Sequence, residues 1–222
     1  TIEEWLSYAP KETLSYFMYQ NPRRAKKLFH DIIPKSSDEF LGHLNKFNTQ
    51  SDQEQIENPV WHIMNGENSI GNVNVTYNLI LNLVAASGKN DPAIILDFVK
   101  KYDENINSSN RQFINDLIKG AINFERDITS EQINYKTPSS EERKIFEDLI
   151  NRLRSQAESA DAETIQTEIY QIGKDHNFEN LRDWFKLIYQ VLFGKEDGPR
   201  FGTFIAIYGI KQTIELIEEK LK

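Results

Sequence analysis

Four basic side chains lie within five residues near the start of the chain, at Arg23, Arg24, Lys26 and Lys27. Cations on neighbouring helical turns can contact successive phosphates of a nucleic acid, and each neutralised phosphate releases counterions. Asn21-Pro22 comes directly before them, and this pair often begins a helix, with Asn as N-cap and Pro in the first turn. The sequence therefore predicts a helix whose polar face carries four phosphate contacts. The alternative is a solvated helix face whose alkyl stems cover the core.

The basic segment differs sharply in charge from the rest of the chain. Residues 21–35 contain five cations and one Asp, a net charge of +4, whereas all 222 residues carry −8, leaving −12 for the remainder. An acidic body repels a phosphate backbone while a local basic segment attracts it. This distribution favours a single docking orientation on a nucleic acid.

A second candidate site follows an amphipathic segment in the last quarter of the chain. Apolar residues recur at three- and four-residue steps from Leu181 to Leu192, which predicts a helix, and Gly194 stands where a left-handed cap would end it. A polar turn containing Gly198 and Pro199 then presents Arg200 and Phe201.

This segment supplies the residue types that read unpaired RNA bases. Such bases are recognised by aromatic stacking, by Arg guanidinium planes and by hydrogen bonds to their edges. We therefore take Arg200, Phe201 and Trp184 as candidate contacts to a single-stranded loop. The alternative is structural, with Trp184 in the core, Phe201 holding the turn and Arg200 paired with Glu196 or Asp197. The tyrosines Tyr170, Tyr189 and Tyr208 are predicted to be core residues.

No residue pattern indicates catalysis or metal binding. The chain has no cysteine, and its four histidines, at positions 30, 43, 62 and 176, lack the spacing of metal ligands. No nucleophile elbow or phosphate-cradling glycine loop occurs. We therefore predict no metal ion, no cofactor and no catalytic residue in this chain.

The elements that position the candidate residues are all predicted to be helices. A hydrophobic content of 39% and a charged content of 27% suit a soluble globular protein, and no apolar run approaches the ~20 residues that span a bilayer. Helix-start signals recur, including a capping box at Thr1 to Glu4 and Asp91-Pro92. The predicted fold is an all-α multi-helix bundle or cage in two packed subdomains. Residues 48–57 and 65–74 are predicted connections, Ser37 is a predicted N-cap, and 128–139 is a predicted boundary.

Two blocks of sequence resemble the class I lysyl-tRNA synthetases. W-F-K-L-I-Y-Q-V-L-F-G, residues 184–194, and G-P-R-F-G-T-F-I-A-I-Y-G, residues 198–209, together look like the C-terminal signature of that family. Residues 15–35 are similar to the segment that follows its K-M-S-K-S loop. Weaker likeness at 79–86 and 121–127 falls in the same order, so the resemblance spans the chain.

The resemblance implies a place in a larger, cytoplasmic protein. In that family a Rossmann catalytic domain precedes helical domains that form a cage for the tRNA anticodon. Residues 1–50 would be connecting helices, 51–136 a first helical subdomain and 137–222 the anticodon-binding cage. The chain begins with Thr1 rather than Met and contains neither an H-I-G-H-like nor a K-M-S-K-S motif. We therefore expect a C-terminal piece that is inactive alone.

The implied partners are tRNA(Lys) and the parent's own N-terminal catalytic domain, with no DNA and no membrane. ATP and lysine would bind the parent's catalytic domain, which ligates lysine to its tRNA. The basic segment matches the part of the family that leads from the catalytic core toward the tRNA stem. A helical protein–protein interaction module without RNA binding is the alternative, which the acidic balance and aromatic-rich helices favour.

Overall fold

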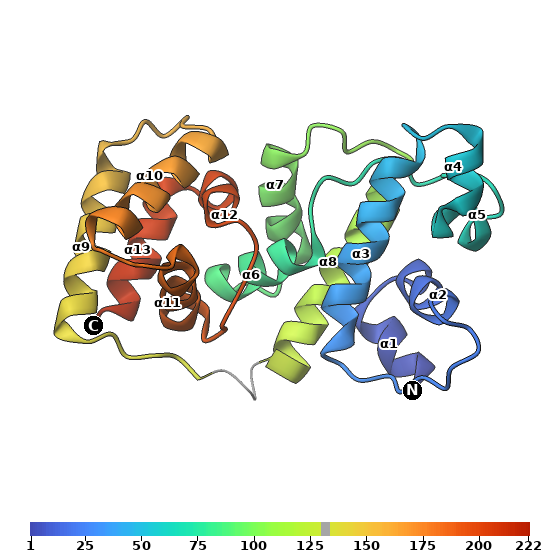
Figure 1. Ribbon diagram of the computed structural model, residues 1–222, viewed down its shortest axis with the longest axis horizontal. Coiled ribbons are helices and arrows are strands. Elements are labelled where there is room, and N and C mark those ends of the chain that lie inside the picture. Colours follow the sequence, from blue (N-terminus) through green and yellow to red (C-terminus); the bar gives the residue numbers. More distant parts are fainter. Residues whose placement is uncertain (130–133) are drawn as a thin grey trace. The chain divides into compact units, whose positions relative to one another are not determined.

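The computed structural model describes residues 1–129 and 134–222, and within them it contains thirteen α-helices, one π-helical turn and no strand (Figure 1). The all-α prediction is confirmed. Contacts divide the chain into two compact units, which we call unit 1 (residues 1–84 and 89–131) and unit 2 (residues 85–88 and 132–222). The predicted boundary segment, 128–139, includes residues 130–133, which lie outside the described part of the chain.

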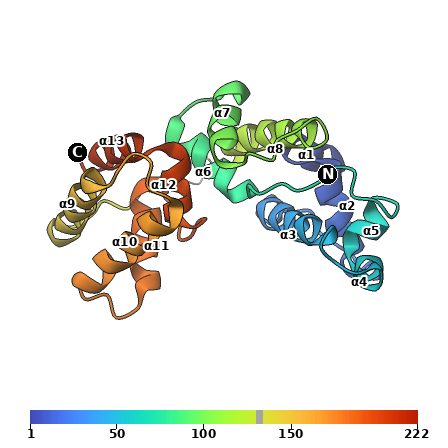
Figure 2. The same ribbon diagram turned by 90° about the horizontal axis from the view of Figure 1, so that it is seen from above.

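Unit 1 is formed by the first eight helices and the π-helical turn, drawn from blue to yellow-green in Figures 1 and 2. Helix α1 packs on α8, α2 packs on α3 and α5, and α7 packs on α8. The elements are α1 (Ile2–Tyr8), α2 (Lys11–Tyr19), α3 (Ile32–Phe47), α4 (Asp52–Glu57), α5 (Pro59–Ile63), α6 (Tyr77–Ser87, whose last residues belong to unit 2), α7 (Pro92–Tyr102), α8 (Arg111–Phe124) and η1 (Glu125–Thr129).

Local capping signals fix several helix starts in unit 1. Thr1 and Glu4 form the predicted capping box of α1. The side chains of Asn58 and Asp91 accept hydrogen bonds from the first turns of α5 and α7, each followed by Pro at the first helical position. Large apolar side chains then join the helices in a common core, with Trp5, Phe40 and Tyr77 at most 1% exposed.

Unit 2 contains five helices around a second core. They are α9 (Ser140–Ser155), α10 (Ala162–Asp175), α11 (Leu181–Phe193), α12 (Phe201–Tyr208) and α13 (Ile210–Lys220). Helix α11 ends as predicted at Gly194, which adopts the left-handed conformation with φ 65°. Phe146, Trp184 and Phe204 are fully buried. Helix α12 lies so close to α10 that a Cβ at Gly202 would be 2.5 Å from the Ala162 carbonyl oxygen.

Three local predictions in unit 1 were wrong. Residues 52–57 form α4, because Ser51 and Glu54 make a capping box that outweighs the polar composition. Helix α3 begins at Ile32, and Ser37 is a buried residue inside it rather than its N-cap. The helix expected after Asn21-Pro22 is absent, since residues 21–31 form turns and irregular backbone.

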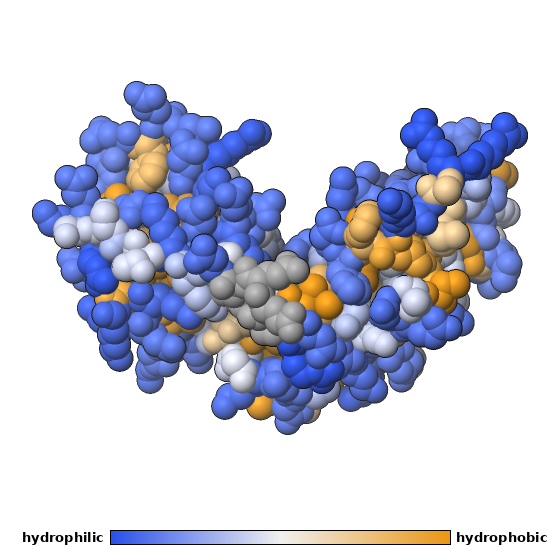
Figure 3. All heavy atoms as spheres, turned by 90° about the horizontal axis from the view of Figure 1, so that it is seen from below, coloured by the Kyte–Doolittle hydropathy of each residue, from blue (hydrophilic) through white to orange (hydrophobic). Residues whose placement is uncertain are grey.

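On the face seen in Figure 3, hydrophilic residues cover most of each unit and hydrophobic ones gather in smaller patches. No described helix is long and apolar enough to cross a lipid bilayer.

Candidate nucleic-acid interface

The four basic residues lie on a loop, which we call the basic loop, residues 20–31. Asn21 adopts a left-handed conformation with φ 52°, which Asn tolerates better than most residues. The backbone N–H of Arg24 donates to the Asn21 carbonyl oxygen at 3.1 Å. This bond closes a β-turn with Pro22 at its second position. The Asn-Pro pair therefore makes a turn here instead of starting a helix.

Lys26 differs from the other cations of the basic loop. Its ammonium group donates to the carbonyl oxygen of Phe17 and lies 4.5 Å from the centroid of the Phe17 ring. Burial lowers the pKa of Lys26. A cation at carbonyls of a helix end is stabilising, so Lys26 fastens the loop to the end of α2.

Arg23, Arg24 and Lys27 are exposed. Within the described residues, no carboxylate pairs with any of the three. Three unpaired cations on one short loop can contact phosphates without first breaking an ion pair. The phosphate contacts predicted from sequence thus remain available at these three positions, whereas Lys26 is used structurally.

Unit 2 contains a hollow of about 480 Å³, which we call the α10–α11 pocket. This volume falls in the ~300–1,000 Å³ range of small-ligand sites. The pocket lies between α10, α11 and the turn that leads to α12. Its lining combines aromatic rings, cations and carboxylates, from Gln166, Tyr170, Arg182, Asp183, Phe185, Lys186, Tyr189, Glu196, Asp197, Gly198, Pro199, Arg200 and Phe201.

An exposed aromatic ring and an exposed guanidinium both line this pocket. Tyr170 is 39% exposed, and its ring meets Phe185 edge to face with centroids 5.2 Å apart. Arg182 is exposed, and no carboxylate of the described chain pairs with it. Lys186 pairs with Glu196 at 2.8 Å. The arrangement offers a planar base both a ring for stacking and a free hydrogen-bond donor.

Tyr189 fixes the shape of the turn that closes the pocket. Its hydroxyl donates to the Pro199 carbonyl oxygen, and burial, with a smaller contribution from Asp197, raises its pKa, so it remains a neutral donor. A Cβ at Gly198 would lie 2.1 Å from the Tyr189 ring. Only glycine therefore allows the turn to approach this ring so closely.

The three predicted base contacts have different positions. Arg200 lines the pocket, and its guanidinium pairs with Glu163 of α10 at 2.7 Å. Phe201 is fully buried and its ring stacks on Phe204 at 5.7 Å.

Trp184 is also fully buried, and its Nε1 donates to the Ile169 carbonyl oxygen at 3.0 Å. The Trp184 ring packs against Phe146 and Phe178. Rings enclosed on both faces cannot stack on an RNA base, so Phe201 and Trp184 serve as packing residues.

Sequence reasoning missed the pocket's exposed residues. Tyr170 was predicted in the core but is among the exposed residues of α10, because the buried seam of that helix runs through Ile165, Ile169 and Ile172. A helical projection of α10 would have placed Tyr170 beside this seam instead of on it. Arg182 was not predicted as a site residue, because several residues that line the pocket with it come from α10 and the turn.

The described residues contain no group of three or more His, Asp or Glu side chains arranged to hold a metal ion. The largest ionic cluster of the described residues instead joins three carboxylates to Arg152.

The chain is similar to known proteins in two comparisons. The sequence model of the class I tRNA synthetases (K) matches residues 1–67. The chain is 40% identical to a lysine–tRNA ligase of Rickettsia bellii (strain OSU 85-389) over the whole chain and 43% of that protein. It is 40% identical to the lysine–tRNA ligase of Rickettsia felis, again over the whole chain and 42% of that protein.

The lysine–tRNA ligase of Rickettsia conorii is 39% identical over the whole chain and 43% of that protein. The chain thus spans less than half the length of the relatives it matches. No solved structure matches the chain. The similarity over all of the chain, together with the family match, fits a C-terminal fragment of a class I lysyl-tRNA synthetase.

Proposed function

We propose that this chain is an RNA-binding module that holds the anticodon arm of lysine tRNA for a class I lysyl-tRNA synthetase. In the longer protein, a separate catalytic domain uses ATP to ligate lysine to that tRNA. This chain positions and selects the tRNA, and it contributes no catalytic residue. Its partners are tRNA(Lys) and that catalytic domain.

The observation that carries the proposal is that Tyr170 and Arg182, both exposed, line the same α10–α11 pocket. Base stacking on an aromatic side chain contributes about 1–3 kcal/mol per base. A neighbouring guanidinium supplies donors for a base edge or a phosphate. Tyr170 is exposed, and Arg182 has no carboxylate partner in the described chain, so both groups are available to an unpaired nucleotide.

The basic loop of unit 1 supplies the second part of the proposal. Arg23, Arg24 and Lys27 contact phosphates, which adds affinity that does not depend on sequence. Such contacts position an RNA, whereas groups that touch the bases select it. The basic loop should therefore determine how RNA binding depends on salt, and the α10–α11 pocket should determine how it depends on RNA sequence.

Titration of labelled lysine tRNA over a range of salt concentrations tests the proposal. Binding should weaken as salt rises, and the double variant Arg23→Gln/Arg24→Gln should lower the log–log slope by about 1.5, at ~0.7–0.9 per lost phosphate contact. The matched control is Lys11→Gln/Lys46→Gln, which removes the same charge from exposed positions outside the basic loop.

The control variant should keep the wild-type slope. No binding of lysine tRNA at low salt would overturn the proposal. If both double variants have the same salt slope, Arg23 and Arg24 of the basic loop do not contact RNA phosphates. Absent or salt-independent binding of lysine tRNA would favour the alternative of a protein-interaction module without RNA binding.

A further inference from the structure

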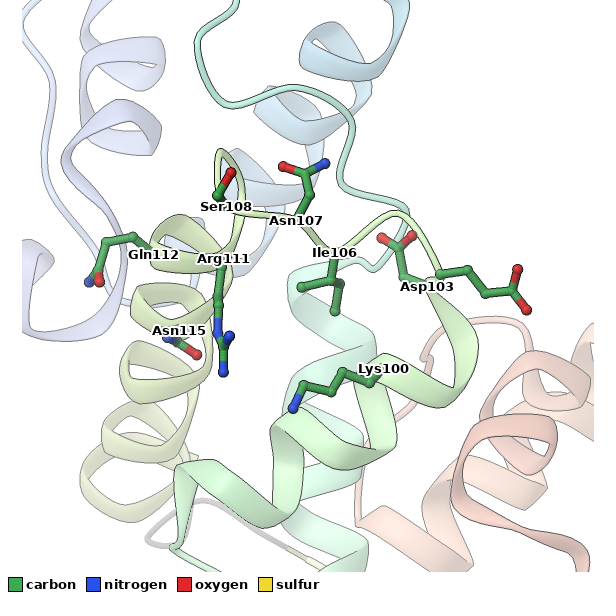
Figure 4. A pocket seen from close by; sticks show the side chains of 9 residues that line it. Lys100, Asp103, Ile106, Asn107, Ser108, Arg111, Gln112 and Asn115 are labelled. Carbon is green, nitrogen blue, oxygen red and sulfur yellow. The ribbon is translucent and has the colours of Figure 1, made fainter.

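Unit 1 also contains a polar hollow, which lies between the end of α7 and the start of α8 and has a volume of about 680 Å³. We call it the α7–α8 pocket. Figure 4 shows Lys100 of α7 and Arg111 of α8 extending toward the same space. Both residues line the pocket and both are exposed. Two like charges that share a hollow are stabilised by an anion between them.

Arg111 is available for a ligand. In the described part of the chain its guanidinium has no carboxylate partner. Lys100 has one weak partner, Asp97, at 3.6 Å, and this pair is well exposed. An exposed pair of this kind contributes about 0–1 kcal/mol, so an incoming anion can readily take the place of Asp97.

The carboxylates near the pocket do not cancel its two cations. Asp103 is 2% exposed and its oxygens accept hydrogen bonds from the backbone N–H groups of Asn74 and Asn105 at 2.9 and 3.0 Å. Its charge is therefore already balanced by amide donors. Glu104 lines the pocket, is exposed and is expected to repel an anion.

The start of α8 adds to the attraction. Asn110, the residue before the helix, makes no side-chain hydrogen bond to its first turn, because its Oδ1 accepts from the N–H of Asn107 at 2.9 Å. The helix dipole there favours negative charge. This contribution supports the paired cations and does not by itself define a site.

We propose that Lys100 and Arg111 form a binding site for a phosphate group, supplied by an RNA backbone or by a free phosphate compound. A guanidinium matches two phosphate oxygens in a planar fork, while an ammonium acts as a point charge. In its RNA form the inference rests on the proposed function. In its free-phosphate form it is independent of that function.

The test follows the backbone amides and the Arg111 Nε–H of the full 222-residue chain by NMR while inorganic phosphate is added at constant ionic strength. Phosphate should shift the signals of Arg111 and of the first turn of α8, with chloride as the reference anion. The double variant Lys100→Gln/Arg111→Gln should lose these shifts. The control Lys101→Gln/Lys119→Gln removes the same charge from exposed positions on the same two helices that do not line the pocket and should retain them.

A second measurement distinguishes the two sources of phosphate. If an RNA phosphate occupies the pocket, Lys100→Gln/Arg111→Gln should lower the salt-dependence slope for lysine tRNA by about 1 relative to the control. Phosphate-induced shifts without a change in slope assign the site to a free phosphate compound. Glu104→Gln should strengthen either form of binding.

The result that overturns the inference is the absence of phosphate-induced shifts at Arg111 together with equal slopes for the two double variants. That outcome differs from failure of the proposed function, in which lysine tRNA does not bind but the phosphate titration remains positive.

Discussion

The side chain of Gln166 in α10 caps the first turn of α12, with its Oε1 accepting a hydrogen bond from the backbone N–H of Gly202 at 2.7 Å. Arg200, which precedes α12, makes no side-chain cap of its own. Gln166 is 1% exposed, so the bond is shielded from water. The start of the helix that carries the Arg200–Phe201 pair is therefore fixed by a residue thirty-six positions earlier in the chain.

Replacing Gln166 should destabilise unit 2. Gln166→Leu keeps a similar volume but leaves a buried helix N–H without an acceptor, which costs about 1–3 kcal/mol of unfolding free energy. The measurement is urea unfolding followed by circular dichroism. Thr167→Ala, at an exposed position next in α10, is the control and should change the unfolding free energy by less than about 0.5 kcal/mol. Equal unfolding midpoints for Gln166→Leu and the wild type would show that the cap contributes nothing.

A comparable cap occurs in unit 1, where Asp38 of α3 accepts from the N–H of Tyr77 at 2.5 Å and from the side chain of Asn78 at 2.7 Å. Both caps join residues that are distant in sequence. No local pattern predicts them, and this is one reason why the start of α12 at Phe201 could not be assigned from sequence.

Gly198 should tolerate no side chain. Gly198→Ala would place a Cβ 2.1 Å from the ring of Tyr189, whose hydroxyl is held by the Pro199 carbonyl oxygen. Such an overlap costs about 1–3 kcal/mol. We expect a lower unfolding midpoint and weaker binding of lysine tRNA, because the turn that closes the α10–α11 pocket must shift.

Gly42→Ala is the matched control for Gly198→Ala. A Cβ at Gly42 has no neighbour within 4 Å, and alanine in a helix is favoured over glycine by up to about 1 kcal/mol. This variant should be neutral or more stable. Loss of stability at both positions would mean that the Tyr189 contact is not the cause.

Acid should weaken the charge cluster that links α9 to α10. Arg152 contacts Asp148, Glu168 and Asp175 at 3.1, 3.1 and 2.6 Å. Hydrogen bonds from Arg152 and then Gln171 lower the pKa of Asp175. Burial by itself raises the pKa of Asp148, but hydrogen bonds from Arg152 and His176 outweigh it and the pKa is lowered.

A carboxylate whose pKa is lowered by folding stabilises the folded state at every pH above its pKa in the unfolded chain, which is about 3.9. This stabilisation is lost as the pH falls through the still lower folded pKa. Arg152→Met should therefore reduce the melting temperature at pH 7, and the difference from wild type should shrink below pH ~4. Arg154→Met, which removes an exposed pair with Glu218, should have a smaller effect. A difference that stays constant between pH 7 and pH 3 would contradict the assignment.

Lys26 should behave differently from its neighbours in the basic loop. Lys26→Met keeps an apolar stem against Phe17 but removes the hydrogen bond to the Phe17 carbonyl oxygen. We expect a loss of about 1–2 kcal/mol of unfolding free energy without the change in salt slope expected for Arg23→Gln/Arg24→Gln. A flattened slope with unchanged stability would instead identify Lys26 as a phosphate contact.

The sequence predicted most helices because their signals are local. Asp91-Pro92 predicted α7, and the apolar periodicity followed by Gly194 predicted α11 with its cap. Asn21-Pro22 was misread, because the same pair can begin a helix or a β-turn and the left-handed backbone of Asn21 decides between them. The sequence could not show that Lys26 has a structural role while Arg24 stays exposed, since this difference depends on the position of the Phe17 carbonyl oxygen.

The candidate base-contacting site was predicted only in part. Periodicity located the correct turn, and Arg200 does line the pocket. It did not show that Phe201 points into the core or that Tyr170 and Arg182 stand open beside the turn, because these facts depend on how α10, α11 and α12 pack.

The most direct test of the account compares the affinity of the chain for lysine tRNA with its affinity for the same tRNA carrying a different anticodon. A base held in the α10–α11 pocket by a hydrogen bond from Arg182 to its edge predicts a loss of about tenfold for the altered tRNA, because another base does not offer the same acceptor. Tyr170→Ala and Arg182→Gln should each reduce that difference while the salt slope stays near the wild-type value. Equal affinities of the wild-type chain for both tRNAs would contradict anticodon recognition by this chain.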